Sequence, residues 1–344
     1  MGYRYFAPMC ALTFLLSAPI PGQVPSAASK PSPKSEAKHT APPRTPDGHP
    51  DLQGIWTNVT LTPLERPAAL AGKATLPDAE AAAYEKKAAE DLQSEDGKSE
   101  GPLLAAAGSA GTGAYNLLFI DRGSELARVG GVKRTSLIVD PPDGKVPPLT
   151  EQAKQQKAED FERYDSVKDR PLSERCILGF GSTSGPPMLP VLYNNNYQIV
   201  QTPDTVMIMI EMVHDVRVIR MNATHRPPNV SQWLGDSIGH WEGDTLVVDT
   251  SNFPDKAALY EEVADSRTSK KLHVIERFQR IAADTILYRA TIDDSYTFAK
   301  PWTVEFPFLS TKGPVYEYAC HEGNYAMPDI MGGARKSDAA SEKK

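Results

Sequence analysis

The sequence lacks any concentration of positive charge. Its 344 residues include 37 Lys and Arg against 44 Asp and Glu, giving a net charge of −7, and the basic residues form no cluster. A nucleic-acid groove needs a basic patch that neutralises phosphates. We therefore expect no nucleic-acid partner, and a small molecule is the expected ligand or substrate.

Motifs for cofactors and activated nucleophiles are also lacking. Gly111-Thr112-Gly113 is no dinucleotide fingerprint, and the chain has no G-x-S-x-G serine elbow. Cys320-His321 lacks the first cysteine of the C-x-x-C-H motif that attaches haem. The sequence thus predicts that no cofactor is bound.

Short metal-binding motifs do not occur either. The chain contains no H-x-H and no H-E-x-x-H, and His214, His273 and His321 are isolated from one another. Three histidines from three strands could still converge as zinc ligands, as in barrel hydratases. Because each histidine stands alone, we expect no metal site and keep zinc as the alternative.

Cysteine is scarce. Of the three cysteines, Cys10 lies in a segment expected to be removed, which leaves Cys176 and Cys320. An even pair in a chain bound for an oxidising compartment predicts a disulfide. Closing so long a loop would stabilise the fold by up to about 5 kcal/mol in the chain-entropy description. Two buried free thiols are the alternative.

Only one long apolar run is present, at the N-terminus. Arg4 precedes the run from Phe6 to Ile20, and small residues follow at Gly22 and Ala27-Ala28. This pattern is typical of an export signal, so we expect residues 1–28 to be a signal peptide and the protein to be periplasmic or secreted. An uncleaved membrane anchor is the alternative. No membrane span is expected after signal cleavage.

Composition divides the rest of the chain. Residues 29–46 are rich in Pro, Ser, Ala and Lys without periodicity, which predicts a disordered linker. Residues 336–344 are polar and patternless, which predicts a disordered tail. Residues 47–335 remain, and we expect them to form a single mainly-β domain.

Two segments in the first half have helical patterns. Thr75 could cap a helix with Pro77 in its first turn, running through "DAEAAAYEKKAAEDLQ" towards Gly97. Thr150 could cap a second helix, "EQAKQQKAEDFERYDS", which would end before Arg170-Pro171. Both are strongly charged with narrow apolar stripes, so we expect two peripheral helices.

Nearly everything else is typical of short strands joined by tight reversals. The clearest segments are "LQGIWTNVTL", "YQIVQT", "TVMIMIEMV", "VRVIRMN", "TLVVDTSNF", "LHVIERFQRI", "TILYRATI" and "WTVEFPFL". Consecutive strands of this kind pair antiparallel. We therefore predict a mainly β fold, an antiparallel meander that closes into a lipocalin-like (calycin-like) barrel or packs as a sandwich.

One charge interrupts the most apolar of these strands. The segment Thr205–Val213 is apolar on both faces except at Glu211, and a buried carboxylate must be paired or have a raised pKa. A hairpin at His214-Asp215 would bring Arg217 within reach. Glu211 is therefore either half of an ion pair with Arg217 or a poised acid or base. His214 could be a base oriented by Asp215, or the two could only hydrogen-bond in a turn.

The segment "YEYACHEGNY", residues 316–325, concentrates further polar groups. As the end of a late barrel strand it would alternate, with Cys320 on one face and His321 on the other. His321 would then face a cavity, titrate near neutrality and move protons or orient a ligand. The alternative is a histidine that only ties down the turn.

Many motifs together resemble a family of exported bacterial proteins, known from acidobacteria and proteobacteria, without an established activity. The resemblance covers about residues 47–335 and rests on "DGHPDLQGIWTN", "RTSLIVDPPDGKVPPLT", "EMVHDVRVI", "QWLGDSIGHWEGDTLVVDTSNF" and "YEYACHEGNY". It implies export and a single domain, and it transfers no catalytic residue. His240 stands where such proteins often carry arginine. Separately, Gly54-Ile55-Trp56 is similar to the G-x-W of lipocalin-like barrels.

Two functions remain open. The first is an exported barrel that binds a small, largely apolar or aromatic molecule in an internal cavity, because aromatic side chains make suitable walls. The second is a cofactor-independent acid/base enzyme, a hydrolase, lyase or isomerase, in the same cavity. Its candidate catalytic residues are His214, Glu211 and His321, and the candidate ligand-binding residues are Arg217, Trp241, Tyr193, Tyr318, Glu322 and Asn324.

Overall fold

The computed structural model describes residues 42–93, 121, 123–161, 166–179, 185–191, 193–255, 268–322 and 325–341. The predicted signal peptide and most of the predicted linker lie outside these residues. Among the helices of the described part of the chain, none has the length and apolar character that crossing a membrane requires.

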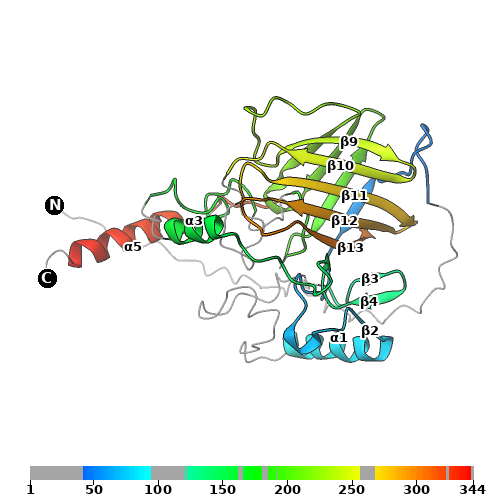
Figure 1. The fold of residues 1–344 in the computed structure, drawn as a ribbon, viewed down its shortest axis with the longest axis horizontal. Helices are drawn as coiled ribbons and strands as arrows, with labels where there is room; N and C mark the ends of the chain where they lie inside the picture. Colours follow the sequence, from blue (N-terminus) through cyan, green and yellow to red (C-terminus); the bar gives the residue numbers. More distant parts are fainter. Residues whose placement is uncertain are drawn as a thin grey trace, which may run out of the picture. The chain divides into compact units, whose positions relative to one another are not determined.

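Ten strands form one sheet, and nine of them close on themselves. Their order is β1-β6-β7-β8-β9-β10-β11-β12-β13-β5, and β1 also pairs with β13. Figure 1 shows β9 to β13 side by side in this curved sheet. The strands are β1 Gly54–Thr57, β5 Ile138–Asp140, β6 Asn196–Gln201, β7 Thr205–Ile210, β8 Val216–Met221, β9 Asp236–Glu242, β10 Thr245–Ser251, β11 His273–Ala282, β12 Thr285–Asp293 and β13 Trp302–Thr311. The mainly β, barrel-type fold is confirmed, and the sandwich is not formed.

The barrel departs from the predicted antiparallel meander at one place. β8 and β9 pair in parallel, with Ile219 opposite Ser237 and Met221 opposite Gly239. Residues 222–235 return from the end of β8 to about its middle, where β9 starts beside it. This connection is much longer than a hairpin turn, so the barrel is mixed.

A small second sheet and three α-helices complete the described part. The sheet has the order β2-β4-β3, formed by Thr75–Leu76, Val132–Arg134 and Arg128–Val129. The α-helices are α1 Asp78–Gln93, α3 Glu151–Phe161 and α5 Ala326–Ser341, and the short 3-10 helices are η1 Ala68–Leu70 and η3 Met212–His214.

Of the two helix caps expected from the sequence, one is formed and the other is not. Thr150 caps α3, because its Oγ1 accepts a hydrogen bond from the Ala153 amide at 3.1 Å. Thr75 caps no helix; it lies in β2, opposite Arg134 of β4. Residues 336–341, where the sequence predicts a disordered tail, are the last part of α5. Alanine and lysine in that segment favour helix even without an apolar stripe.

Aromatic side chains fill the barrel interior. Alternate residues of each strand point inward, and the seven largest of these are Trp56, Trp302, Tyr197, Tyr288, Phe278, Phe306 and Phe308, none more than 1% exposed. The Tyr288 ring lies 5.0 Å from Phe308 and 5.2 Å from Phe306, centroid to centroid. This aromatic cluster is the core of the protein.

The two edges of the barrel differ. One edge carries the tight turns after β6, β9 and β11, at residues 202–204, 243–244 and 283–284. The other edge, which we call the site rim, is formed by the starts of β6, β8, β9 and β11 and the ends of β7 and β10. The registers place these ends at one level, for example Met209 opposite Val216 and Thr250 opposite Val274.

Candidate functional site

The predicted disulfide is present. Cys176 and Cys320 are bonded, with their Cα atoms 5.8 Å apart. The segment that contains Cys320 is not a barrel strand, however, because β13 ends at Thr311 and residues 312–319 have no regular secondary structure. Gly313 and Pro314 follow soon after β13, and proline cannot donate a hydrogen bond that would continue the strand pairing. The predicted alternation of Cys320 and His321 on a strand is therefore wrong.

Glu211 is buried at the site rim, just after the end of β7, and only 2% of it is exposed. Its carboxylate accepts hydrogen bonds from Asn196 Nδ2 at 2.8 Å and from the Tyr316 amide at 2.9 Å. The predicted ion pair between Glu211 and Arg217 is wrong. Glu211 instead fastens the segment after β13 to the start of β6.

Arg217 points into the barrel from β8 and pairs with Glu276 of β11. The Nη2–Oε2 distance is 2.6 Å and both side chains are at most 1% exposed. Tyr288 donates its hydroxyl hydrogen to Glu276 Oε1 at 2.8 Å. Arg217 Nη2 also reaches the Ser237 hydroxyl at 3.4 Å. Arg217 is thus a core residue, closed off from any ligand at the surface.

The other predicted catalytic residues do not converge. His214 is exposed in a turn with φ of +49°, and its neighbour Asp215 is half-buried. Burial raises the pKa of Asp215, and the charge of His214 opposes that shift. His321 is exposed, and no hydrogen bond or ion pair joins the side chains of His214, Glu211 and His321 within the described residues.

The predicted ligand-binding residues are divided between the two edges. Tyr193 and Tyr318 stack near the disulfide, with ring centroids 6.5 Å apart. Trp241 lies by the turn at the opposite edge and stacks on His49 at 4.6 Å. Glu322 is exposed, and Asn324 lies outside the described residues. These side chains form no single site.

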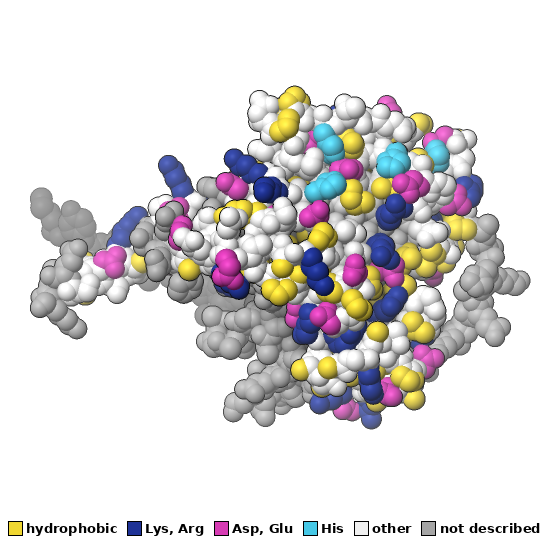
Figure 2. Space-filling view, in the orientation of Figure 1, with side chains coloured by type: hydrophobic (Ala, Val, Ile, Leu, Met, Phe, Trp, Pro, Cys, Tyr) yellow, Lys and Arg dark blue, Asp and Glu magenta, His cyan; other side chains and the backbone are white. Residues whose placement is uncertain are grey.

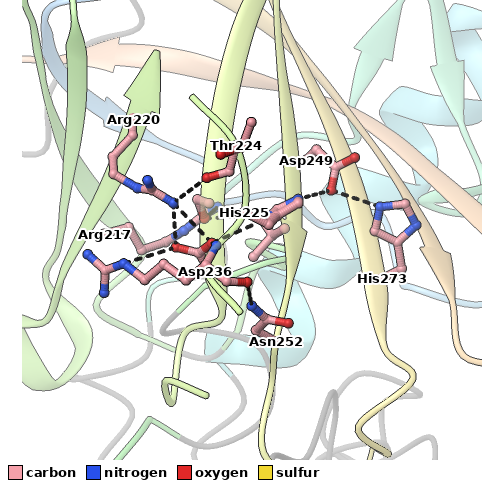
Figure 3. A network of polar contacts seen from close by, with 11 residues as sticks. Arg217, Arg220, Thr224, His225, Asp236, Asp249, Asn252 and His273 are labelled. Atoms are coloured by element: carbon pink, nitrogen blue, oxygen red, sulfur yellow. Dashed lines mark hydrogen bonds and ion pairs between the residues drawn. The ribbon is translucent and has the colours of Figure 1, made fainter. Parts of the chain in front are cut away.

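The structure instead brings together a set that the sequence did not single out. We call it the His–Asp cluster: His225, Asp236, Asp249 and His273, with Arg220. It lies on the outer face of the barrel at the site rim, and Figure 3 shows Asp249 between the two histidines. Figure 2 shows histidine and acidic side chains gathered over the β9–β11 region of this face.

Register explains why these side chains meet. Asp249 of β10 is opposite Ile275 of β11, so His273, two residues before Ile275, is on the same face and diagonal to Asp249. Asp236 begins β9 on that same outer face. The connection from β8 to β9 crosses over it and supplies His225. Parallel pairing of β8 and β9 is thus what delivers this histidine.

Asp236 is the buried anchor of the cluster, with a side chain 3% exposed. It accepts hydrogen bonds from Arg220 Nη2 at 2.9 and 3.0 Å, the Arg226 amide at 2.8 Å and His225 Nδ1 at 3.1 Å. Burial by itself would raise the pKa of Asp236. The hydrogen bonds from Arg226, His225 and Arg220 outweigh burial and hold the pKa below its usual value. Asp236 is therefore a carboxylate that fixes His225.

Asp249 holds both histidines through one oxygen. Its Oδ1 lies 2.9 Å from His225 Nε2 and 2.8 Å from His273 Nε2. Burial would raise the pKa of Asp249, but the hydrogen bonds with His273 and His225 dominate and lower it. In return, the hydrogen bond to Asp249 is the main cause that raises the pKa of His273, against partial burial. Asp249 and His273 thus stabilise one another's charged forms.

The cluster contains ligand-type side chains but not a metal centre. Among the described residues, no group of three or more His, Cys, Asp or Glu side chains could hold a metal ion. The alternative zinc set of His214, His273 and His321 is not assembled: His273 belongs to the His–Asp cluster, and the other two have no contact with it in the described part of the chain.

A signal for part of the cluster is present in the sequence. Asp249 interrupts "TLVVDTSNF" and His273 opens "LHVIERF", and both fall on the outward phase of their strands. Recognising the pair requires knowing that these strands are neighbours. His225 had no such signal, because it lies in an irregular connection.

Comparison with known proteins adds no assignment. No protein-family model, no curated protein and no solved structure matches this chain.

Proposed function

We propose that this protein is an exported β-barrel enzyme that transfers protons to or from a small molecule at the His–Asp cluster, with His273 as the acid/base group. The observation that carries the proposal is the bridging of two imidazoles by Asp249, with Asp236 behind the inner one. A base held by a carboxylate, which is itself held in place, is the arrangement that general acid–base catalysis requires.

The protonation states follow from the contacts. Ionised Asp236 and Asp249 only accept hydrogen bonds, and each of them faces one ring nitrogen of His225. His273 uses Nε2 for Asp249, and no described residue hydrogen-bonds its Nδ1. The side chain is 42% exposed. Nδ1 is therefore the atom that meets a ligand, and its proton is the one transferred.

The charges indicate which group of the ligand faces His273. Protonated His273 presents a positively charged N–H to the ligand, with Arg220 and Arg226 at 2.9 and 3.7 Å from Asp236 behind it, while Asp236, Asp249 and the nearby Asp293 are the carboxylates. A positively charged donor favours an oxygen that bears or develops negative charge. The substrate is accordingly a small molecule with a carbonyl or ester oxygen, in a reaction of the hydrolase, lyase or isomerase type.

Export is part of the proposal and is supported by the disulfide between Cys176 and Cys320. Structural disulfides persist in oxidising compartments, so a periplasmic or secreted location agrees with the apolar N-terminal segment. The internal ligand cavity expected from the sequence does not carry the proposal, because the aromatic side chains that face the interior have essentially no accessible surface.

The test is hydrolysis of p-nitrophenyl acetate by the mature protein across pH 5 to 9, compared with His273→Gln and Asp249→Asn. Loss of an acid/base group reduces rates by about 10² to 10⁴, and we expect His273→Gln to do so. Asp249→Asn should move the pH profile to lower pH, because it removes the main cause of the raised His273 pKa.

The matched control is His240→Gln. His240 lies on the same outer face, is 51% exposed and contacts only Glu242 among the described acidic residues. If the ester were cleaved nonspecifically by any surface imidazole, His273→Gln and His240→Gln would reduce the rate by the same amount. Equal rates for His273→Gln, His240→Gln and wild type would overturn the proposal.

A further inference from the structure

A short segment closes the barrel at the site rim, on the interior side. We call residues 185–191 the plug. Its Met188 and Leu189 side chains have no exposed surface and belong to the same core cluster as the barrel interior. Two strand-end asparagines hold its backbone: Asn58 donates to the Met188 carbonyl at 2.9 Å, and Asn195 exchanges hydrogen bonds with Val191 at 2.8 Å.

Polar groups lie beneath the plug, among the aromatic side chains of the core. The Met188 amide donates to the Tyr288 hydroxyl at 2.9 Å, Tyr288 donates to Glu276, and Glu276 pairs with Arg217. Asn58 Nδ2 also approaches the Tyr197 hydroxyl at 3.4 Å. Burying a charged pair in a core is commonly no more stabilising than apolar packing. Stability alone therefore does not explain why Arg217 and Glu276 are buried here.

Two atoms in this polar group have no hydrogen-bond partner. Arg217 Nε, a donor, and Asn58 Oδ1, an acceptor, are buried and unpaired within the described part of the protein. As whole residues, Arg217 is 2% exposed and Asn58 is 1% exposed. Native structures satisfy nearly all such groups, and exceptions need an explanation. One donor and one acceptor at the same barrel mouth match a ligand that offers one of each.

The plug rests directly on Arg217. A Cβ atom at Gly185 would lie 2.7 Å from Arg217 Cδ and 3.4 Å from its Nε, and the φ angle of Gly185 is +131°. Any side chain at this position would have to push the plug away from the guanidinium. The contact is therefore one of close backbone approach, which only glycine allows.

We propose that the plug is a displaceable lid over a second ligand site inside the barrel mouth. The ligand is a neutral molecule whose oxygen accepts from Arg217 Nε and whose N–H or O–H donates to Asn58 Oδ1. Its apolar body takes the place of Met188 and Leu189 against Tyr197 and Tyr288. It is neutral because Glu276 already balances the charge of Arg217. This site faces inward and is separate from the outward-facing His–Asp cluster.

Benzamide is a suitable probe, since one amide supplies both the acceptor and the donor. Sodium benzoate, which lacks the donor, and toluene, which lacks both groups, are the matched controls. We expect benzamide alone to raise the melting temperature of the protein. We also expect benzamide to increase the rate at which hydrogen peroxide oxidises Met188, followed by peptide-resolved mass spectrometry, because displacement exposes this buried thioether.

Gly185→Ala sharpens the test. The variant should loosen the plug and so increase the fraction of molecules in which the site is open. Because apparent affinity is proportional to that fraction, benzamide should bind about tenfold or more tightly. Gly54→Ala is the control, because Gly54 has nearly the same φ, +133°, while a Cβ there meets nothing closer than 3.6 Å. If Gly185→Ala does not fold, Leu189→Ala takes its place in the test. This variant removes only apolar contacts between the plug and the core.

The expected pattern is binding of benzamide in wild type, tighter binding in Gly185→Ala or Leu189→Ala, and no tightening in Gly54→Ala. His273→Gln should bind benzamide normally, so that failure here is distinguishable from failure of the acid/base site. Absence of benzamide binding in every variant, or binding that leaves Met188 oxidation unchanged, would overturn the proposal.

Discussion

Two acid–base pairs lie at the same rim of the barrel, one on the inner face of the sheet and one on its outer face. On β11, Glu276 points inward to Arg217, while His273 points outward to Asp249. The inner pair is almost completely buried and the outer one is about one third exposed or more. The same chemistry thus has two uses: the inner charges are locked in place, whereas the outer ones can exchange protons with solvent or a ligand.

Burial decides the difference. Inside the barrel, water cannot stabilise either charge, so each depends on its partner. Removing one partner leaves the other charge buried and uncompensated. On the outer face, solvent screens the charges, and the pair contributes little to stability while keeping its shifted pKa values. The predictions that follow test this contrast, from the largest expected effect to the smallest.

Glu276→Gln should destabilise the protein strongly. It leaves Arg217 buried without a counter-charge and Tyr288 with a weaker acceptor. Loss of one partner of a buried pair typically costs about 3 to 5 kcal/mol. The measurement is the free energy of unfolding in urea. Glu242→Gln, which breaks the exposed pair with Arg277, should leave the free energy of unfolding almost unchanged, because solvent screens the pair; a similar loss in both variants would remove the contrast between buried and exposed pairs.

Cys320→Ser should cost the next largest amount. The disulfide closes a loop between residues 144 positions apart and ties the segment after β13 to the segment before the plug. Removing such a cross-link costs about 2 to 5 kcal/mol. Thiol titration of the denatured, unreduced mature protein should find neither Cys176 nor Cys320 free. Two reactive thiols would contradict the bond.

Glu211→Gln should have an intermediate effect. The carboxylate accepts from two amide donors, Asn196 Nδ2 and the Tyr316 amide, and a glutamine side chain can accept with only one of its two terminal atoms. One buried donor then loses its partner, at a cost of about 1 to 3 kcal/mol. Urea unfolding measures it. Unchanged stability would mean that the side chain is solvated.

The smallest effect on stability is expected from Asp249→Asn. The folded pKa of His273 is raised, so its stabilising contribution is present below about pH 6.5, the ordinary histidine value, and disappears as pH rises through the folded pKa. The lowered pKa of Asp249 acts the opposite way, and its contribution disappears as pH falls through that value. Because the groups are partly exposed, the total should stay below about 1 kcal/mol.

Titration of the His273 ring by NMR checks this directly. In Asp249→Asn the pKa of His273 should fall towards the ordinary histidine value, because the main cause of its raised pKa is removed. A His273 pKa that does not respond would show that Asp249 is not its partner in solution.

Local patterns in the sequence predicted much of the architecture. The segments "TILYRATI" and "WTVEFPFL" predict strands, and they form most of β12 and β13. The even number of cysteines remaining after export predicts the pair Cys176 and Cys320. These inferences succeed because the period of a strand and the parity of cysteines are properties of the chain itself.

Tertiary structure alone decided the partners. Arg217 was expected to meet Glu211, its neighbour in sequence, yet it meets Glu276 because barrel closure brings β11 across the interior from β8. His225 reaches Asp236 and Asp249 because the chain crosses the outer face before β9 begins in parallel with β8. Which side chains touch depends on register and closure between strands far apart in the chain, and both result from the packing of the whole core rather than from any local pattern.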